Sequence, residues 1–530
     1  MSATEYVFGA NTIENLTTGM YQDSRIIYRE YIQNACDQID KAKAVGILAE
    51  NEGLVKIWIE PKERRIEIED NATGIPSASF VKTLGDVANS SKKIGEDKGF
   101  RGIGKLAGLA YCKKLVFTSS AKGENIISTM ECDAALMREL IDEHNQGKKH
   151  TAIEILQNTY KFSTQPTDDT DSHFFRVEII DVNEENKDLL QVEEIRGYLS
   201  FVAPVPYSSK FYIKEKIYKY AKDHAHKIDE YNITINGQSL FKEYELNYKT
   251  RSGDDAIRDI VFHEFKDNNN VDLGWMWLGV SGFKGSIPES CKMRCLRLRK
   301  ENIQIGGENA LQRFFTEDRG VKYFIGEIFV TSPMLIPNSQ RDYFNENEAR
   351  ISFEQVIRRY VNGELNKIYH KGSEMNTHLS NLRKFDKEVA DFEEKKRNND
   401  FLNPSYEKKA KEHMEAVRSK AEAAKKFFQK VQEKENEGIA EGIIAGVASK
   451  RMDEYKKERR AEKKKEAEQN TTSAPKAKSQ TTKTSRRTDK FVSYSKKERK
   501  LIERIYIAID KAVDKKIAEQ IYQAIEENLL

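Results

Sequence analysis

The chain has 530 residues, of which 33% are charged and 38% are hydrophobic, and its formal net charge is only +3. This length suggests about three or four domains, and so small a net charge does not indicate a nucleic-acid or acidic partner for the chain as a whole. Five cysteines are too few for a disulfide framework and fit a reducing compartment. No signal peptide opens the sequence, and no run reaches the roughly 18 apolar residues of a membrane span. We therefore expect a cytoplasmic protein without a membrane segment.

Residues 1–205 alternate helix and strand patterns. SRIIYREYIQNACDQIDKA (24–42) has apolar residues at helical spacing, and LVKIWIEP and RRIEIED alternate like paired strands. Few helices beside many antiparallel strands are typical of an α+β sandwich. Residues 206–345 form a second mixed region in the same pattern, and its strand candidates include YNITINGQSL with an Asn-Gly turn.

Residues 346–468 are dominated by helix formers and charged residues. Seven apolar residues recur there at alternating steps of four and three: Ala410, Met414, Val417, Ala421, Ala424, Phe428 and Val431. Such a heptad seam is typical of a coiled coil. A hairpin packed within one chain and a dimerising coiled coil fit this alanine-rich seam equally well.

The last 62 residues divide into a tail and a short helical module. Residues 469–490 are rich in Ser, Thr and Lys, without apolar periodicity, which predicts a flexible linker. Six basic residues against one acidic residue give the linker a charge of +5. A basic tail can bind phosphates, but without interleaved aromatic residues we favour a merely solvated tail. Residues 491–530 resume helical spacing as two short helices, which we interpret as a docking module for a protein partner.

Two polar motifs in the first 205 residues carry candidate chemistry. Glu30, Asn34 and Asp37 lie on one face of the expected helix, one turn apart. Asp70 ends an expected strand and is followed by a small-residue turn with Gly74, where a carboxylate can accept a hydrogen bond from a flat amine ligand. Taken alone, the first pattern also fits a solvent-exposed helix face, and the second also fits a plain Asx turn.

The third motif is GFRGIGKLAGLAYC, residues 99–112. Three glycines at spacing G-x-x-G-x-G are interleaved with an arginine and a lysine, and an apolar, helix-like run follows. Backbone N–H groups of such a turn at a helix start can hold phosphates, although glycines also serve tight turns that bind nothing. The polar residues 90–93 before it form a candidate lid.

Together, in this order and spacing, the three motifs resemble the GHKL ATPase superfamily of gyrase B, the large heat-shock chaperone, histidine kinases and MutL. Glu30, Asn34 and Asp37 resemble its N box, residues 70–74 its first glycine box and residues 99–104 its second. One departure is that Ala72 stands where the family usually has glycine.

The resemblance covers residues 5–205 and extends loosely to 345, where RLRKENIQIG and IPNSQRDYF are similar to the second domain of MORC-, chaperone- and MutL-like proteins. The nearest relatives would be prokaryotic MORC-like or chaperone-like ATPases. It implies a Bergerat-type α/β sandwich (1–205), an S5-like transducer domain (206–345) and a mainly helical, coiled-coil C-terminal region.

The resemblance also implies roles for individual residues. Glu30 is the general base that activates water, Asn34 is the Mg²⁺ ligand, Asp37 supports the same helix face, and Asp70 accepts the adenine amino group. Arg341, or alternatively Lys300, reaches the γ-phosphate from the second domain. The remaining nucleotide-binding candidates are Gly74, Ser91, Lys92, Gly99, Arg101, Gly102, Ile103, Gly104, Lys105 and Thr118.

We therefore expect a slow, Mg-dependent ATPase that binds ATP and acts as an ATP-gated homodimeric clamp. DNA is one candidate substrate, and a role in anti-phage defence is an analogy with relatives. Two alternatives stay open. The first is a chaperone that remodels a protein client, and the second is a nucleotide-sensing scaffold that recruits an effector protein through residues 491–530.

Overall fold

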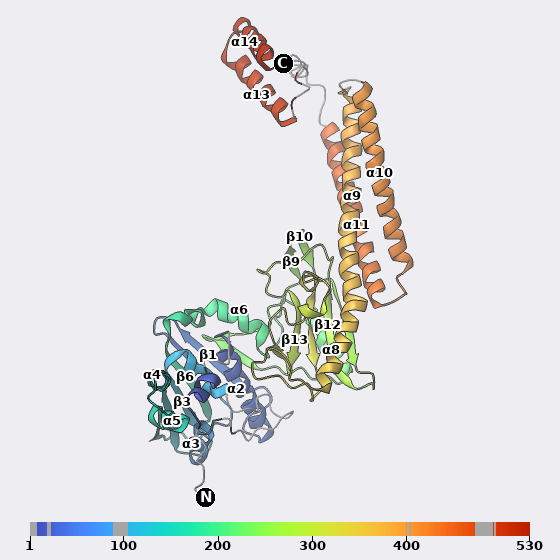
Figure 1. Cartoon of the computed structure of the whole chain (residues 1–530). Coiled ribbons are helices and arrows are strands. Elements are labelled where there is room, and N and C mark those ends of the chain that lie inside the picture. Colours follow the sequence, from blue (N-terminus) through green and yellow to red (C-terminus); the bar gives the residue numbers. More distant parts are fainter. Residues whose placement is uncertain are drawn as a thin grey trace. The chain divides into compact units, whose positions relative to one another are not determined.

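The computed structural model (Figure 1) describes residues 8–17, 23–87, 89, 104–398, 400–401, 404–471, 491, 494 and 496–529. The chain divides into two compact units: Met1–Ser373 with Gly438–Ile443, and Glu374–Glu437 with Ile444–Leu530. The first unit contains two large sheets with their helices, and the second is helical. The α+β class expected from the sequence is confirmed.

An eight-stranded sheet organises the N-terminal part of the first unit, in the order β5-β4-β3-β6-β2-β1-β7-β8. Its strands are β1 Leu54–Glu60, β2 Arg65–Asp70, β3 Cys112–Ser120, β4 Ile126–Asp133, β5 Tyr160–Pro166, β6 Phe174–Val182, β7 Asn232–Ile235 and β8 Gln238–Ser239. The accompanying helices are α1 Asn11–Leu16, α2 Ile26–Ala44, α3 Ser77–Gly85, η1 Gly104–Ala110, α4 Ala134–Asn145, α5 Ala152–Thr159, η2 Glu184–Leu190 and α6 Val192–Val202.

Alternation along the strands gives this sheet one apolar and one charged face. In β2, Ile66 and Ile68 point to the core and pair with Ile179 and Val177 of β6. Helix α2 covers the apolar face, because its residues at helical spacing are buried in the same core. The residues between them in β2 are charged and face the other side of the sheet.

The hairpin β7–β8 belongs to this first sheet, although the sequence places residues 232–239 in the second domain. Strand β7 pairs in parallel with β1, and Ile233 and Ile235 are buried in the first core. Parallel pairing joins segments far apart in the chain, so no local pattern indicates it. The domain boundary expected at residue 205 therefore does not coincide with the edge of the sheet.

A five-stranded sheet forms the core of the second domain, in the order β11-β12-β15-β13-β14, and β13 and β15 are parallel. Its strands are β11 Asp259–Lys266, β12 Asp272–Val280, β13 Cys295–Lys300, β14 Ile303–Ile305 and β15 Ile325–Val330, beside the hairpin of β9 Asn247–Thr250 and β10 Gly253–Ala256. The helical segments here are α7 Lys214–Asp223, η3 Gln312–Phe314, η4 Gly320–Tyr323, α8 Glu348–Tyr360 and the π-helical turn η5 Val361–Leu365.

A buried ionic cluster stabilises this sheet. Glu327 is fully buried and lies between the side chains of Arg299 and Lys242, with the Lys242 ammonium 3.0 Å from a carboxylate oxygen. Two cations and two tyrosine hydroxyls, from Tyr207 and Tyr244, contact this single carboxylate. They hold the pKa of Glu327 down to about 2 against the effect of burial.

Three long helices follow: α9 Asn366–Arg397, α10 Pro404–Glu433 and α11 Ile439–Thr471. They lie side by side (Figure 1), with an ion pair between Arg383 and Glu458 at 2.8 Å linking α9 to α11. Five residues of the predicted seam are buried within the chain: Val417, Ala421, Ala424, Phe428 and Val431. The seam of α10 is thus covered by helices of the same chain.

The C-terminal module contains α13 Lys496–Ala512 and α14 Lys515–Leu529. Its small core consists of Phe491, Ile502, Tyr506, Ala518 and Tyr522. The Tyr522 hydroxyl donates to the Tyr506 carbonyl at 3.0 Å, and the Tyr494 hydroxyl donates to the Leu529 carbonyl at 2.9 Å. The second bond brings the start of α13 to the end of α14, so the two helices run antiparallel.

Candidate active site

Helix α2 presents the polar face that the sequence predicts. Glu30 and Asp37 are only 7% and 4% exposed, and Asn34 is half-buried. The opposite face packs on the sheet through residues such as Ile27 and Ala35. Burying two carboxylates on one helix face is costly unless partners compensate for it, so the surroundings of Glu30 are informative.

Glu30 lies where three parts of the first unit meet. A side chain at Gly104, where η1 begins, would place its Cβ 2.6 Å from Glu30 Oε2. On the other oxygen, Arg341 Nε lies 3.0 Å from Oε1 in an ion pair that is about nine-tenths buried. The structure therefore brings together the N-box glutamate, the end of the second glycine box and the second-domain arginine.

The loop that carries Arg341 is held close to α2. Arg29 donates from Nη2 to the Gln340 carbonyl at 3.1 Å. Arg341 itself is 8% exposed and has a positive φ of 53°, a backbone conformation that non-glycine residues adopt at a cost. The contacts of Arg29 and Glu30 thus fix this loop on the acidic face of α2.

Asp70 ends β2 on the core side of the sheet. It is 4% exposed, and the Ala72 backbone N–H donates to its Oδ1 at 3.0 Å. Burial raises the pKa of this carboxyl to about 7, an effect that the Ala72 hydrogen bond opposes. A carboxylate so poorly solvated gains from a buried donor such as an amino group.

The turn after Asp70 requires the glycine that the sequence predicts. Gly74 has φ of +63°, and a Cβ at this position would lie 1.9 Å from the Ser120 carbonyl oxygen of β3. A side chain at position 74 would be strained at this φ and would also clash with the Ser120 carbonyl. Gly74 therefore lets the turn approach β3 beside Asp70.

Tyr31 fixes the start of the glycine-box helix on α2. Its hydroxyl donates to the Lys105 carbonyl at 3.1 Å and accepts from the Gly108 N–H at 3.0 Å. Residues of α2 thus position η1 as well as supplying the acidic face.

Three predicted residues, Lys105, Lys300 and Thr118, are not brought to the cluster around Glu30. The Lys105 ammonium instead donates to the carbonyls of Thr83, at 2.7 Å, and Asp86 at the end of α3, and burial lowers its pKa to about 8. Unpaired carbonyls at a helix C-terminus attract a cation, and this competes with a phosphate role. The Lys300 ammonium donates to the Ser332 carbonyl at 2.7 Å.

Thr118 lies on the opposite face of the sheet from Asp70. Thr118 pairs with Arg176, which in turn pairs with Glu69, and cross-strand partners share a face. Asp70 is the next residue of β2 and therefore points to the other side.

Six further predicted residues lie outside the described part of the chain: Ser91, Lys92, Gly99, Arg101, Gly102 and Ile103.

Two residues beside the site, Ser119 and Arg29, were not predicted from the sequence. The Ser119 hydroxyl lies on the Asp70 face, accepts from the Ile75 N–H at 2.7 Å and donates to the Phe174 carbonyl at 3.0 Å. The alternation of β3 places Ser119, rather than Thr118, on the core face, and this was a usable signal. Arg29 had no such signal, because its partner lies in another domain.

Neither a self-contained metal site nor a membrane span is present in the described ranges. No group of three or more His, Cys, Asp or Glu side chains there could hold a metal ion. An ion bound at Asn34 would therefore need phosphate oxygens and water as further ligands. None of the described helices offers an apolar stretch of the length needed to cross a bilayer.

Comparison with known proteins gives partial matches in the N-terminal region. "Chaperone protein HtpG" of Fusobacterium nucleatum is 27% identical over 174 residues, which is 28% of this chain and 29% of the relative. HtpG of Legionella pneumophila is 36% identical over 80 residues, 14% of this chain and 13% of the relative. HtpG of Aliarcobacter butzleri is 29% identical over 86 residues, 15% and 14% of the two chains.

The matched stretches thus span less than a third of these curated relatives. A family model described as "Histidine kinase-, DNA gyrase B-, and HSP90-like ATPase" matches residues 24–165, the range that contains α2, Asp70 and Gly104. Residues 24–165 are thus similar to the ATPase domain of the GHKL superfamily, and the N-terminal region has partial likeness to HtpG chaperones.

Proposed function

We propose that the chain hydrolyses ATP slowly, with Mg²⁺, at the site around Glu30. The observation that carries this proposal is the convergence of Gly104 and Arg341 on the two oxygens of the Glu30 carboxylate. A general base needs to lie within hydrogen-bond reach of the water that attacks the phosphoryl group. A glycine-rich helix start and an arginine are groups that hold and neutralise the phosphoryl group.

In this proposal Glu30 polarises the attacking water while Arg341 neutralises charge on the γ-phosphate. The ion pair between the two must then exchange, because an arginine bound to phosphate releases the carboxylate to act as a base. Asn34 would contribute one oxygen to Mg²⁺, which would neutralise phosphate charge, and phosphates and water would supply the remaining ligands. Asp70 accepts the adenine amino group and so selects adenine.

We propose that exchange of this ion pair couples ATP binding to the closing of a homodimeric clamp. The HtpG relatives favour chaperone-like remodelling of a protein client as its task, whereas action on DNA stays the alternative that the sequence analysis raised. Salt-sensitive binding of double-stranded DNA that disappears when residues 469–490 are deleted would select the DNA alternative.

Turnover of the wild type beside Glu30→Ala and Asp70→Asn tests the site assignment. We expect Glu30→Ala to bind ATP with little hydrolysis, because the base is lost and the pocket is kept. Asp70→Asn is expected to lose ATP binding, since its amide would place an N–H donor against the adenine amino group. Phosphate release and equilibrium binding of labelled ATP measure the two effects. Hydrolysis by Glu30→Ala at the wild-type rate would refute the assignment.

A further inference from the structure

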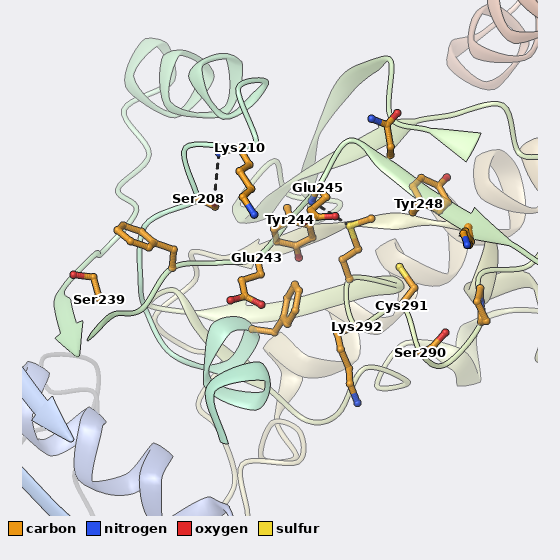
Figure 2. A pocket seen from close by; sticks show the side chains of 16 residues that line it. Ser208, Lys210, Ser239, Glu243, Tyr244, Glu245, Tyr248, Ser290, Cys291 and Lys292 are labelled. Carbon is orange, nitrogen blue, oxygen red and sulfur yellow. Dashed lines mark hydrogen bonds between the residues drawn. The ribbon is translucent and has the colours of Figure 1, made fainter. Parts of the chain in front are cut away.

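The second domain holds a cavity of about 510 Å³ (Figure 2). This volume lies within the range of sites that bind small ligands or peptide segments. Its floor is apolar and buried: Phe201, Tyr244, Tyr248 and Met293 are each at most 9% exposed. It is lined by residues 201–293 and contains none of the residues assigned to the nucleotide site.

The floor is rigid before any ligand arrives. The Tyr244 hydroxyl donates to buried Glu327 at 3.1 Å, and Arg299 Nη2 donates to the Phe201 carbonyl at 2.7 Å. Two of the four floor residues, Tyr244 and Phe201, are thus bonded to the ionic cluster of the sheet. A preorganised floor reduces the entropy lost when a partner binds.

One wall is the run of residues 240–250, in which buried and exposed residues alternate on both sides of a bend at Leu246. Its inward residues are buried apart from half-buried Leu246, and its outward residues are exposed. The outward side chains are Phe241, Glu243, Glu245, Asn247 and Lys249. On each side of the bend, neighbouring outward side chains of extended chain repeat about every 7 Å, the same spacing as alternate side chains of a second extended chain. Only residues 247–250 of this wall belong to a strand, β9.

The rim combines charges of both signs that are not paired with each other. Glu243 and Glu245 lie on this wall, and Lys210 and Lys292 lie elsewhere on the rim (Figure 2). Lys249 follows further along the wall. None of these five side chains forms an ion pair with another residue in the described part of the chain.

Elsewhere in the same domain, by contrast, exposed Lys216 is paired with Asp259 at 2.6 Å. Unpaired charges of both signs around an aromatic floor fit a ligand that carries both signs itself.

We infer that this cavity binds an extended polypeptide segment with an apolar side chain between charged ones. The apolar side chain fills the floor, basic side chains lie opposite Glu243 and Glu245, and an acidic side chain lies opposite a rim lysine. Main-chain pairing along an extended wall is a common mode of peptide recognition. A polyanion such as nucleic acid fits poorly, because two carboxylates would face its phosphates.

The test uses the full-length protein without nucleotide. The probe is a short fluorescein-labelled peptide in which valine alternates with lysine in one half and with glutamate in the other, followed by fluorescence anisotropy. In the variant Glu243→Lys with Glu245→Lys, we expect at least about tenfold weaker binding, because two attractive pairs become repulsive. An all-glutamate version of the peptide is expected to bind this variant more tightly than the wild type.

The matched control is Glu215→Lys with Asp318→Lys, which makes the same change of charge at exposed sites outside the cavity. This control is expected to bind the probe like the wild type. Glu30→Ala is also expected to bind the probe normally, so that peptide binding is tested separately from the proposed hydrolysis. Equal weakening in both double variants would overturn the inference. Preferential binding of a labelled single-stranded oligonucleotide, lost in the Lys210→Glu with Lys292→Glu variant, would also overturn it.

Discussion

Glu30 shows how one side chain connects sequence, packing and chemistry. Its position on α2 follows from the helical spacing of Ile27, Tyr31 and Ala35, which bury the other face. Its contacts come from Gly104 and Arg341, which lie far away in the sequence. Glu30 was predictable because its motif resembles the N box in spacing, but its ion pair with Arg341 depends on how distant parts of the chain pack.

Removal of Arg341 tests its part in hydrolysis. Arg341→Ala is expected to lower turnover by about a hundredfold, the usual loss for a group that stabilises charge in the transition state, while ATP binding changes little. The control is Arg319→Ala, an exposed arginine of the same domain that pairs with Glu317. Steady-state phosphate release and nucleotide titration would measure both quantities. Unchanged turnover in Arg341→Ala would remove this residue from the site.

The buried carboxyl of Asp70 predicts a pH effect on folding stability. Its pKa is raised to about 7 in the folded protein but lies near about 3.9 in an unfolded chain. Between these values the folded state holds a proton that the unfolded state has lost. The free energy of unfolding therefore falls as pH rises, by about 1.4 kcal/mol per pH unit.

Asp70→Asn should not show this fall, because it has no proton to lose. Thermal unfolding midpoints of the wild type and Asp70→Asn are measured at about pH 5 and about pH 8. We expect the difference between the two midpoints to be larger at the higher pH. Glu139→Gln, at an exposed site on α4, should follow the wild type at both. A gap that does not depend on pH would show that Asp70 is not buried as described.

At the scale of elements, α2 was the easiest to predict and the hairpin β7–β8 the hardest. The expected helix over 24–42 and the observed Ile26–Ala44 differ by two residues at each end, since local spacing determines such a helix. The hairpin pairs with β1 across the sheet, which no local pattern reports. Lys105 illustrates a third case, because the end of α3 offers its ammonium carbonyl partners that the sequence does not reveal.

Substitutions at Gly74 and Gly104 are expected to affect folding and catalysis separately. Gly74→Ala should destabilise the ATPase domain, because its Cβ would meet the Ser120 carbonyl of β3. Gly104→Ala should leave the domain folded but lower turnover, because its Cβ would displace the Glu30 carboxylate.

Gly197→Ala provides the control, since its Cβ would meet open space within α6. We expect it to be neutral or stabilising by up to about 1 kcal/mol. Thermal unfolding and turnover of the three variants separate the effects. Normal turnover in Gly104→Ala would contradict the contact with Glu30.

At the scale of the whole molecule, we expect two copies to meet through the two-helix module. Each helix has exposed apolar residues directly before its buried ones. They are Leu501 and Ile505 in α13, before Ile502 and Tyr506, and Ile517 in α14, before Ala518. Because the two helices run antiparallel, both rows turn to the same side of the module. So few residues bury little surface alone, and a second copy packed on this face would enlarge the core.

We expect the wild type to be a dimer and Leu501→Glu with Ile517→Glu to be a monomer, because charge on this face opposes burial. Light scattering after size-exclusion chromatography measures the mass. Ile153→Glu with Ile351→Glu, at exposed apolar sites outside the module, should remain dimeric. A dimeric Leu501→Glu, Ile517→Glu variant would place the contact between copies elsewhere.

A double-mutant cycle at Glu30 and Arg341, read out as single-turnover ATP cleavage, tests the central claim most directly. If the N-box glutamate and the second-domain arginine act as one catalytic unit, each single alanine variant loses most of the rate. The double variant is then no slower than the slower single variant. Losses that multiply in the double variant would show that the two residues act independently and would contradict a single site shared by the two domains.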